Sequence, residues 1–240
     1  MSQPVFLTAP HFSFTHAFST RHGGVSQEPF HSLNLGGTLD RQEYIDANRK
    51  LFAAALGFDI TQVARLHQVH GTDVLQAKPG VQTGDALVTN EKGILLAIGA
   101  ADCYPLLFED AQAGVIGAAH AGWKGTLGRI AMRTIEKMIS LGAESSRIRI
   151  AIGPGISCAN YEVGEELITK FRSENFPETC FSGIHLDLLE ANRTVLLESG
   201  IAENNIWMLN RCTTEDDFFS HRRDKGVTGR LWGVIGMKSA

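Results

Sequence analysis

Three residues of this chain carry side chains that suit a metal ion, and each lies in a segment rich in small residues. They are His70 in Gln68–Gly71, Cys103 in Ala101–Pro105 and His120 in Ala119–Trp123. Two imidazoles and one thiolate suit a borderline-soft ion such as zinc. Three protein ligands would leave one coordination position for water or substrate, as in catalytic rather than structural zinc sites. The trio therefore leads to the hypothesis of a catalytic zinc centre.

The same atoms support two other interpretations. Cys103 could be a nucleophile with His120 as its base, as in a cysteine hydrolase, provided that its surroundings favour the thiolate. The adjacent Asp102 opposes a thiolate unless its carboxylate points elsewhere. Most single cysteines are simply packed as small hydrophobes, and no HxxxH or CxxC pair anchors a metal site here. The residue pattern alone leaves these interpretations open.

Further polar residues are candidates for binding a substrate. Arg21 lies in a glycine-rich turn and could bind an anion, and Asn34 could contact a ligand or cap a turn. Lys124 follows His120 in Gly122–Gly125, where backbone N–H groups at a helix start could hold phosphate. A basic cluster near the C-terminus is typical of a solvated face, with anion capture as the minority interpretation; it comprises Arg222, Arg223, Lys225 and Arg230.

Apolar periodicity predicts the elements that position these residues. We expect a helix over 41–56, with Asp40 as its N-cap, Glu43 completing a capping box and Gly57 ending it. A long helix over 125–141 would end at Gly142, and two more would cover 163–172 and 187–199. The inner face of the long helix would carry Leu127, Ile130, Ala131, Ile135, Met138 and Ile139. Short apolar runs predict buried strands at 86–89, 94–98, 106–108, 115–119, 147–152, 206–209 and 231–235.

The strand pattern bears directly on the trio. If the run from Leu106 to Ala119 forms two paired strands, the hairpin returns the chain to its starting edge. Cys103 and His120 would then lie at one end of a sheet, and His70 would arrive from a separate loop.

The overall pattern predicts fold class and setting. Several strands follow one another directly between 85 and 119, which favours an α+β fold with mixed sheets flanked by helices, in one domain over 1–240. The net charge is −4 and no basic stripe dominates, so we expect no nucleic-acid partner. No signal peptide and no long apolar run are present, so we expect a cytoplasmic protein without a membrane partner.

An ordered set of motifs resembles one family along most of the chain. The set begins with Ser19–Ser26, Ser32–Gly36 and Asn48–Arg49 and continues through the three segments that contain His70, Cys103 and His120. It ends with Ile152–Ile156, Tyr161–Gly164, Arg211–Thr213, Phe219–Asp224 and Thr228–Arg230. This order resembles the YfiH-like family, also described as laccase-domain or polyphenol oxidase proteins, purine nucleoside phosphorylase-like proteins and peptidoglycan editing factors.

The resemblance implies a fold, a cofactor and a reaction. The fold would be a single α+β domain related to the catalytic domain of cytotoxic necrotizing factor, with a catalytic zinc on His70, Cys103 and His120. The activity would be phosphorolysis of adenosine, inosine, guanosine and methylthioadenosine, with adenosine deamination, so the partners would be a purine nucleoside and phosphate. Copper fits less well, because multicopper sites need HxH-type pairs and the chain has none. Editing of peptidoglycan precursors is an alternative role, and Lys124 stands where the family usually has Arg.

Overall fold

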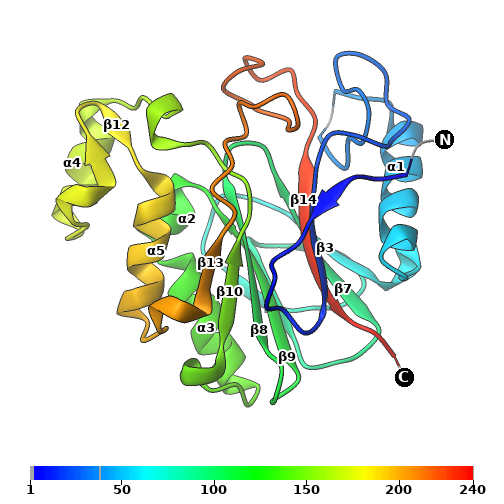
Figure 1. Ribbon diagram of the computed structural model, residues 1–240, viewed down its shortest axis with the longest axis horizontal. Coiled ribbons are helices and arrows are strands. Elements are labelled where there is room, and N and C mark those ends of the chain that lie inside the picture. The colour runs from blue at the N-terminus through cyan, green and yellow to red at the C-terminus, as the bar shows by residue number, and fades with distance from the viewer. Residues whose placement is uncertain (1–2, 38, 240) are drawn as a thin grey trace.

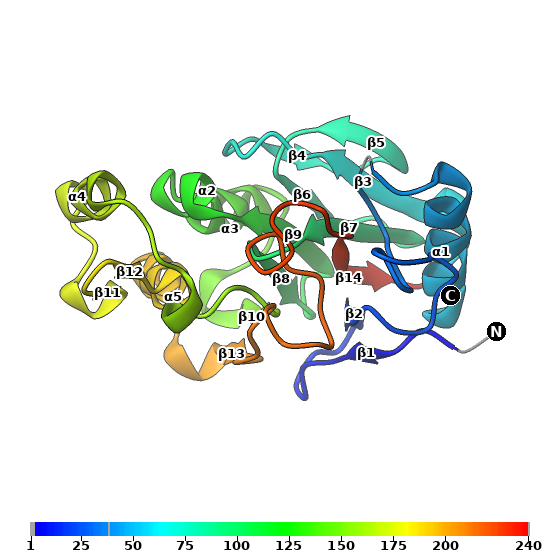
Figure 2. The same cartoon turned by 90° about the horizontal axis from the view of Figure 1, so that it is seen from above.

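Two mixed six-stranded sheets pack face to face, and helices cover the outer face of each (Figures 1 and 2). The computed structural model describes residues 3–37 and 39–239. Neighbouring strands run parallel in some pairs and antiparallel in others, in both sheets. This architecture confirms the predicted α+β fold with mixed sheets flanked by helices.

The first sheet contains the first and the last of the described strands, and also the strand that leads to His70. Its order is β1 (Phe6–Leu7), β2 (Thr15–Ser19), β14 (Leu231–Met237), β7 (Ile94–Ala100), β3 (Val63–His67) and β5 (Gly80–Thr83). The strand β7 is parallel to β3 and antiparallel to β14.

The second sheet contains the hairpin that was expected between Cys103 and His120. Its order is β13 (Ile206–Met208), β10 (Arg149–Ile152), β8 (Tyr104–Asp110), β9 (Val115–Ala121), β6 (Ala86–Thr89) and β4 (Val74–Gln76). Both hairpin strands, β8 and β9, are buried along their whole length. A separate two-stranded ribbon is formed by β11 (Phe181–Ser182) and β12 (His185–Leu186).

The core between the sheets explains why the strand runs are almost uninterruptedly apolar. Leu96 and Ile98 of the first sheet meet Leu107 and Ile116 of the second, and all four are fully buried. The opposite faces of the same strands are buried under helices, so neither face of the central strands contacts water. At roughly 25 cal/mol per Å² of buried apolar surface, this two-sided burial is the main stabilising contribution of the fold.

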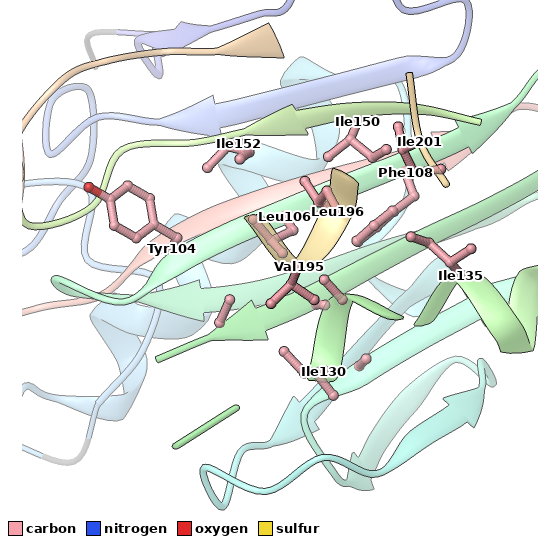
Figure 3. Close-up of a cluster of buried hydrophobic side chains, with 14 of the residues drawn as sticks. Tyr104, Leu106, Phe108, Ile130, Ile135, Ile150, Ile152, Val195, Leu196 and Ile201 are labelled. Carbon is pink, nitrogen blue, oxygen red and sulfur yellow. The ribbon is translucent and has the colours of Figure 1, made fainter. Parts of the chain in front are cut away.

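Helices on opposite sides complete the four layers. They are α1 (Gln42–Ala55), α2 (Trp123–Leu127), α3 (Ile130–Ser140), α4 (Glu165–Ser173) and α5 (Leu188–Glu198). Phe52 of α1 packs with Trp232 and Val234 on the first sheet. Residues of α3 and α5, such as Ile135 and Val195, cover the second sheet around Leu106 and Phe108 (Figure 3).

The structure corrects the predicted start of the first helix. The helix begins at Gln42 with Arg41 as the N-cap, and no side chain caps it, so neither Asp40 nor Glu43 forms the predicted capping box. The Asp40 carboxylate accepts hydrogen bonds from Ser26 and from Asn34 instead. Tertiary hydrogen bonds have therefore taken the acceptor that local sequence assigned to the helix.

The predicted helix over 125–141 is divided in two. The chain breaks between α2 and α3 at Gly128 and Arg129, and Arg129 has a left-handed backbone with φ 61°. The Arg129 side chain donates to Glu198 and to the carbonyl of Glu174, which holds this unusual conformation. Ile139, predicted on the inner face, is exposed. The described residues contain no helix long and apolar enough to cross a membrane.

Candidate metal centre

The predicted trio converges where the chain passes between the two sheets. His70 follows β3 of the first sheet, Cys103 lies between β7 and β8, and His120 is part of β9 in the second sheet. One ligand atom of each residue lies within 4.8 Å of the others, and the two imidazole rings are 4.8 Å apart between centroids. The distant segments therefore present two nitrogens and one sulfur to a common point.

The register of the β8–β9 hairpin brings Cys103 next to His120. Pro105 pairs with His120 and Tyr104 with Ala121, so Cys103 lies just beyond the paired end of the hairpin. Gly122 is essential to this approach, because a Cβ at that position would lie 2.7 Å from the Cys103 sulfur. The predicted hairpin and its role in joining these two residues are confirmed.

The loop that carries His70 is fixed by hydrogen bonds to both sheets. The Gln68 amide donates to the carbonyl of Gly99 on β7 and accepts from its N–H, both at 2.8 Å. The Asp85 carboxylate accepts from the backbone N–H groups of His70 at 3.0 Å and of Gly71 at 2.7 Å. A loop residue with φ 57°, as His70 has, needs such support to stay in place.

Asp85 also orients His120 and was not identified from the sequence. Its carboxylate lies 3.0 Å from His120 Nδ1 and is fully buried. Burial would raise the pKa of Asp85, but the hydrogen bonds from His120 and from the Gly71 backbone lower it. An ionised Asp85 fixes the ring so that Nε2 faces the Cys103 side. The signal available in the sequence was a carboxylate immediately before the buried run Ala86–Thr89.

The surroundings of Cys103 favour the thiolate. Burial would raise the pKa of its thiol, but the adjacent His120 and His70 imidazoles lower it to about 6. Burial would likewise lower the pKa of His120, and the Cys103 thiolate and the Asp85 carboxylate raise it. The Asp102 carboxylate accepts from Thr213 and from the Arg222 backbone. The surroundings of Cys103 therefore stabilise its thiolate beside the protonated form of His120.

The donor set fits one divalent ion. Zinc bonds thiolate sulfur at about 2.3 Å and imidazole nitrogen at about 2.0–2.1 Å, so ligands within 4.8 Å of one another need only small side-chain shifts to share an ion. The thiolate is already favoured, and His120 has a carboxylate on its other nitrogen, as metal-bound histidines commonly do. These three residues are the one such group of three that the described part of the chain contains.

A cavity of about 560 Å³ opens over the trio. Its lining runs from the three donors across the ends of β3 and β7 to the outer face that α1 covers. Four arginines contribute to its wall, from α1, from β3 and from the C-terminal loop; they are Arg49, Arg65, Arg222 and Arg230. Of these, Arg222 and Arg230 had been identified in the sequence as members of a basic cluster, and Arg49, Arg222 and Arg230 belong to the family motifs, whereas no pattern in the sequence pointed to Arg65.

The three residues predicted to bind substrate lie outside the cavity lining. Arg21 donates to the carbonyl of His31 and stacks on Phe219, and Lys124 lies over the Trp123 ring. Asn34 is buried, and its Oδ1 accepts the backbone N–H of Arg230 at 2.8 Å. Asn34 therefore acts on the cavity through the position of Arg230, and substrate contact by any of the three stays a prediction.

The fold and the His–Cys–His centre together define a class of protein, and comparison with known families identifies it. The family described as "Multi-copper polyphenol oxidoreductase laccase" matches residues 15–238, and this chain belongs to that family. The structure of a hypothetical protein YfiH from Bacillus licheniformis is 34% identical and superposes with a TM-score of 0.89, covering 93% of this chain and 92% of that one. The predicted YfiH-like resemblance is thereby confirmed.

Two relatives carry names that state a reaction. A purine nucleoside phosphorylase of Deinococcus radiodurans is 52% identical over 235 residues, which cover 96% of this chain and 92% of the relative. Adenosine deaminase RL5, from an unknown prokaryotic organism, is 34% identical over 245 residues, which cover 91% of this chain and 92% of the relative. Both comparisons span nearly the whole chain.

Proposed function

We propose that this protein is a zinc-dependent enzyme that acts on purine nucleosides. The observation that carries the proposal is the convergence of His70, Cys103 and His120 at the floor of a cavity. Homologues named for purine nucleoside phosphorolysis and adenosine deamination support a purine nucleoside as the substrate. We propose zinc rather than a multicopper cluster, because the described residues offer a single group of three donors, which would leave a fourth position for water as in catalytic zinc sites.

In the proposed enzyme the trio would hold the zinc, and Asp85 would keep His120 in the tautomer that binds through Nε2. When bound, the ion would supply Lewis acidity and a water of lowered pKa. Gln68 and Asp85 would keep the His70 loop in place during turnover, since they tie it to β7 and to the loop before β6. Pre-positioned donors lower the reorganisation that accompanies substrate binding.

Phosphorolysis requires a nucleoside and a phosphate in the same cavity. A phosphate oxygen bonds to C1′ of the ribose while the C1′–N9 bond breaks. The electron pair of the C1′–N9 bond goes to the purine, which takes a proton. The products are ribose 1-phosphate and the free base. The arginines of the cavity wall would balance the charge of the phosphate.

Deamination of adenosine would use the same floor of the cavity. Water adds to C6 of the adenine ring, the C6–N6 bond breaks, and ammonia leaves to give inosine. No phosphate takes part, so the two reactions would differ in their dependence on the arginine-lined wall.

The test is a metal analysis combined with a nucleoside assay on the purified protein. We expect about one zinc per chain, phosphate-dependent release of purine base and phosphate-independent release of ammonia from adenosine. A protein that holds no zinc and converts no nucleoside from a panel of adenosine, inosine, guanosine and methylthioadenosine would contradict the proposal.

A metal-free cysteine hydrolase is the second candidate, and Asp85 is the observation that favours it. Cys103, His120 and Asp85 form the order of nucleophile, base and orienting carboxylate that such enzymes use. His70 separates the two proposals, because a thiol mechanism does not need it. Activity that survives His70→Ala and treatment with a chelator would favour the hydrolase, whereas loss of zinc and of activity together would favour the metalloenzyme.

The proposed centre requires a reduced sulfur. All four cysteines are free thiols in the described structure, and Cys103 must remain so to bind a metal. A reducing compartment such as the cytoplasm fits this requirement.

A further inference from the structure

Three arginines from distant segments line the cavity that opens over the metal centre. Arg49 comes from α1, Arg65 from the middle of β3, and Arg230 from the residue before β14. Gly36 lies between two of them, since a Cβ there would be 3.4 Å from Arg230 Cβ and 3.8 Å from an Arg49 Nη2. The Arg49 guanidinium lies 5.7 Å from the centre of the Trp232 ring. We call Arg49, Arg65 and Arg230 the arginine wall.

Among the described residues, one carboxylate forms an ion pair with the arginine wall. Among residues 3–37 and 39–239, Arg65 and Arg230 form no ion pair, and Arg49 reaches only Asp46, at 3.5 Å. Burial and the neighbouring Arg65 lower the pKa of Arg49 to about 10. Burial lowers the pKa of Arg230 by more than the negative groups of Cys103 and Asp102 raise it. Guanidinium groups that repel one another in a partly buried site are stabilised when an anion binds between them.

The protein nevertheless holds two of these side chains in fixed positions. Arg49 Nε donates to the carbonyl of Leu35 at 2.8 Å, and one Arg230 Nη1 donates to the carbonyls of Thr228 and Gly229. The backbone of Arg230 is tied to Asn34. Each of these arginines retains N–H groups without a partner in the described structure, and the Arg65 side chain donates to none of the described residues. Positioned donors that remain unused point to an external acceptor.

We propose that Arg49, Arg65 and Arg230 form the subsite for inorganic phosphate in the cavity that opens over the metal centre. A phosphate dianion offers several oxygens to the planar forks of guanidinium groups, and three positive charges exceed what one carboxylate would balance. The subsite rests on the proposed phosphorolysis, in which phosphate is the second substrate.

Arg65→Gln is the sharpest test, because Arg65 makes no hydrogen bond that the fold of the described residues would lose. In the zinc-loaded enzyme we expect the KM for phosphate to rise at least about tenfold, which corresponds to about 1.4 kcal/mol, because a charged hydrogen-bond donor to phosphate is lost. The KM for the nucleoside should change much less, and the rise in Tm that phosphate gives the wild-type protein without nucleoside should disappear. Arg65→Lys, which keeps the charge, should restore part of the phosphate affinity.

The matched control is Arg41→Gln. Arg41 is the N-cap residue of α1, and its exposed side chain contacts Glu43, so the variant loses the same charge without touching the cavity. Its KM for phosphate and its phosphate-induced Tm shift should equal those of the wild type.

The outcomes separate the subsite from the proposed function. If Arg65→Gln keeps the wild-type KM for phosphate and the wild-type Tm shift while phosphorolysis proceeds, the subsite is overturned and the proposed function stands. If the wild-type protein converts no nucleoside but phosphate raises its Tm in an Arg65-dependent way, the subsite stands and the proposed function fails.

Discussion

At the level of single residues, Asp85 connects two of the three donors of the candidate metal centre. One buried carboxylate holds the His70 loop through backbone N–H groups and the His120 ring through Nδ1. An amide in its place would keep the shape but lose the negative charge, and its NH₂ group would face N–H donors. The metal centre therefore depends on a residue that does not itself bind the metal.

Asp85→Asn should accordingly reduce metal binding. We expect zinc affinity and activity to fall about 10- to 100-fold, the range found when partners of metal-bound histidines are changed. Metal titration followed by zinc analysis of the desalted protein measures the effect. Asp73→Asn is the control, because Asp73 is exposed in the connection between β3 and β4 that carries His70, and its side chain makes no described hydrogen bond. Wild-type zinc affinity in Asp85→Asn would show that the carboxylate is not needed.

The lowered pKa of Cys103 predicts the pH dependence of its alkylation in the metal-free protein. Only the thiolate reacts, so the rate should rise as the pH passes about 6, well below the ordinary thiol value of 9.0, and level off above it. Buried Cys180, whose pKa is raised to about 11, should stay unreactive across this range. Peptide mapping after timed iodoacetamide treatment distinguishes the two. A rate for Cys103 that still climbs between pH 8 and 9 would contradict the assignment.

At the level of elements, α3 and the β8–β9 hairpin depend on each other. Met138 lies under the helix against Gly117 of β9, and a Cβ on that glycine would be 3.1 Å from the methionine sulfur. Ile139, one residue further along, faces outward and is 46% exposed. Within α3, Met138 and not Ile139 faces the sheet that carries His120.

Met138→Ala and Ile139→Ala should therefore differ strongly in stability. Removing the buried side chain should cost about 2–5 kcal/mol, whereas the exposed position should cost within about 0.5 kcal/mol. Urea denaturation followed by tryptophan fluorescence gives both values on the same protein. Similar losses for the two variants would mean that α3 is rotated from the described position.

For the molecule as a whole, the metal centre lies where the chain passes from one sheet to the other. His70 follows β3 in the first sheet, Cys103 precedes β8 in the second sheet, and His120 belongs to β9 in the second sheet. An ion bound there would link the two sheets at one end, where the apolar core between them gives way to the cavity. Zinc should therefore stabilise the whole fold and not only the loops around it.

Thermal unfolding tests this link between the sheets. At a free zinc concentration 100 times its Kd, binding contributes about 2.7 kcal/mol, which for a chain of this size corresponds to a rise in Tm of roughly 5–11 °C. Cys103→Ala should remove the rise while the far-ultraviolet circular dichroism stays that of the wild type. A chelator should reverse the rise in the wild-type protein, and an unchanged Tm in saturating zinc would argue against a shared ion.

Local patterns in the amino-acid order were enough for much of this description. Buried runs located the strands from Ala86 to Ala121, and the hairpin inferred from them joined Cys103 to His120, because apolar burial and turn formation act between near neighbours. The ordered motifs identified the family. The same patterns failed at Asp40, where distant hydrogen bonds captured the cap, and at Arg129, where ion pairing held a left-handed residue.

Tertiary packing supplied the rest. Asp85 meets His120 and the His70 loop only because β6 pairs with β9, and the arginine wall exists only because α1, β3 and the residue before β14 meet at one end of the first sheet. Polar side chains that contact one another across such distances leave no periodicity along the chain. The packing of the two sheets and their helices decides which polar side chains come into contact, and no single segment of the sequence carries that information.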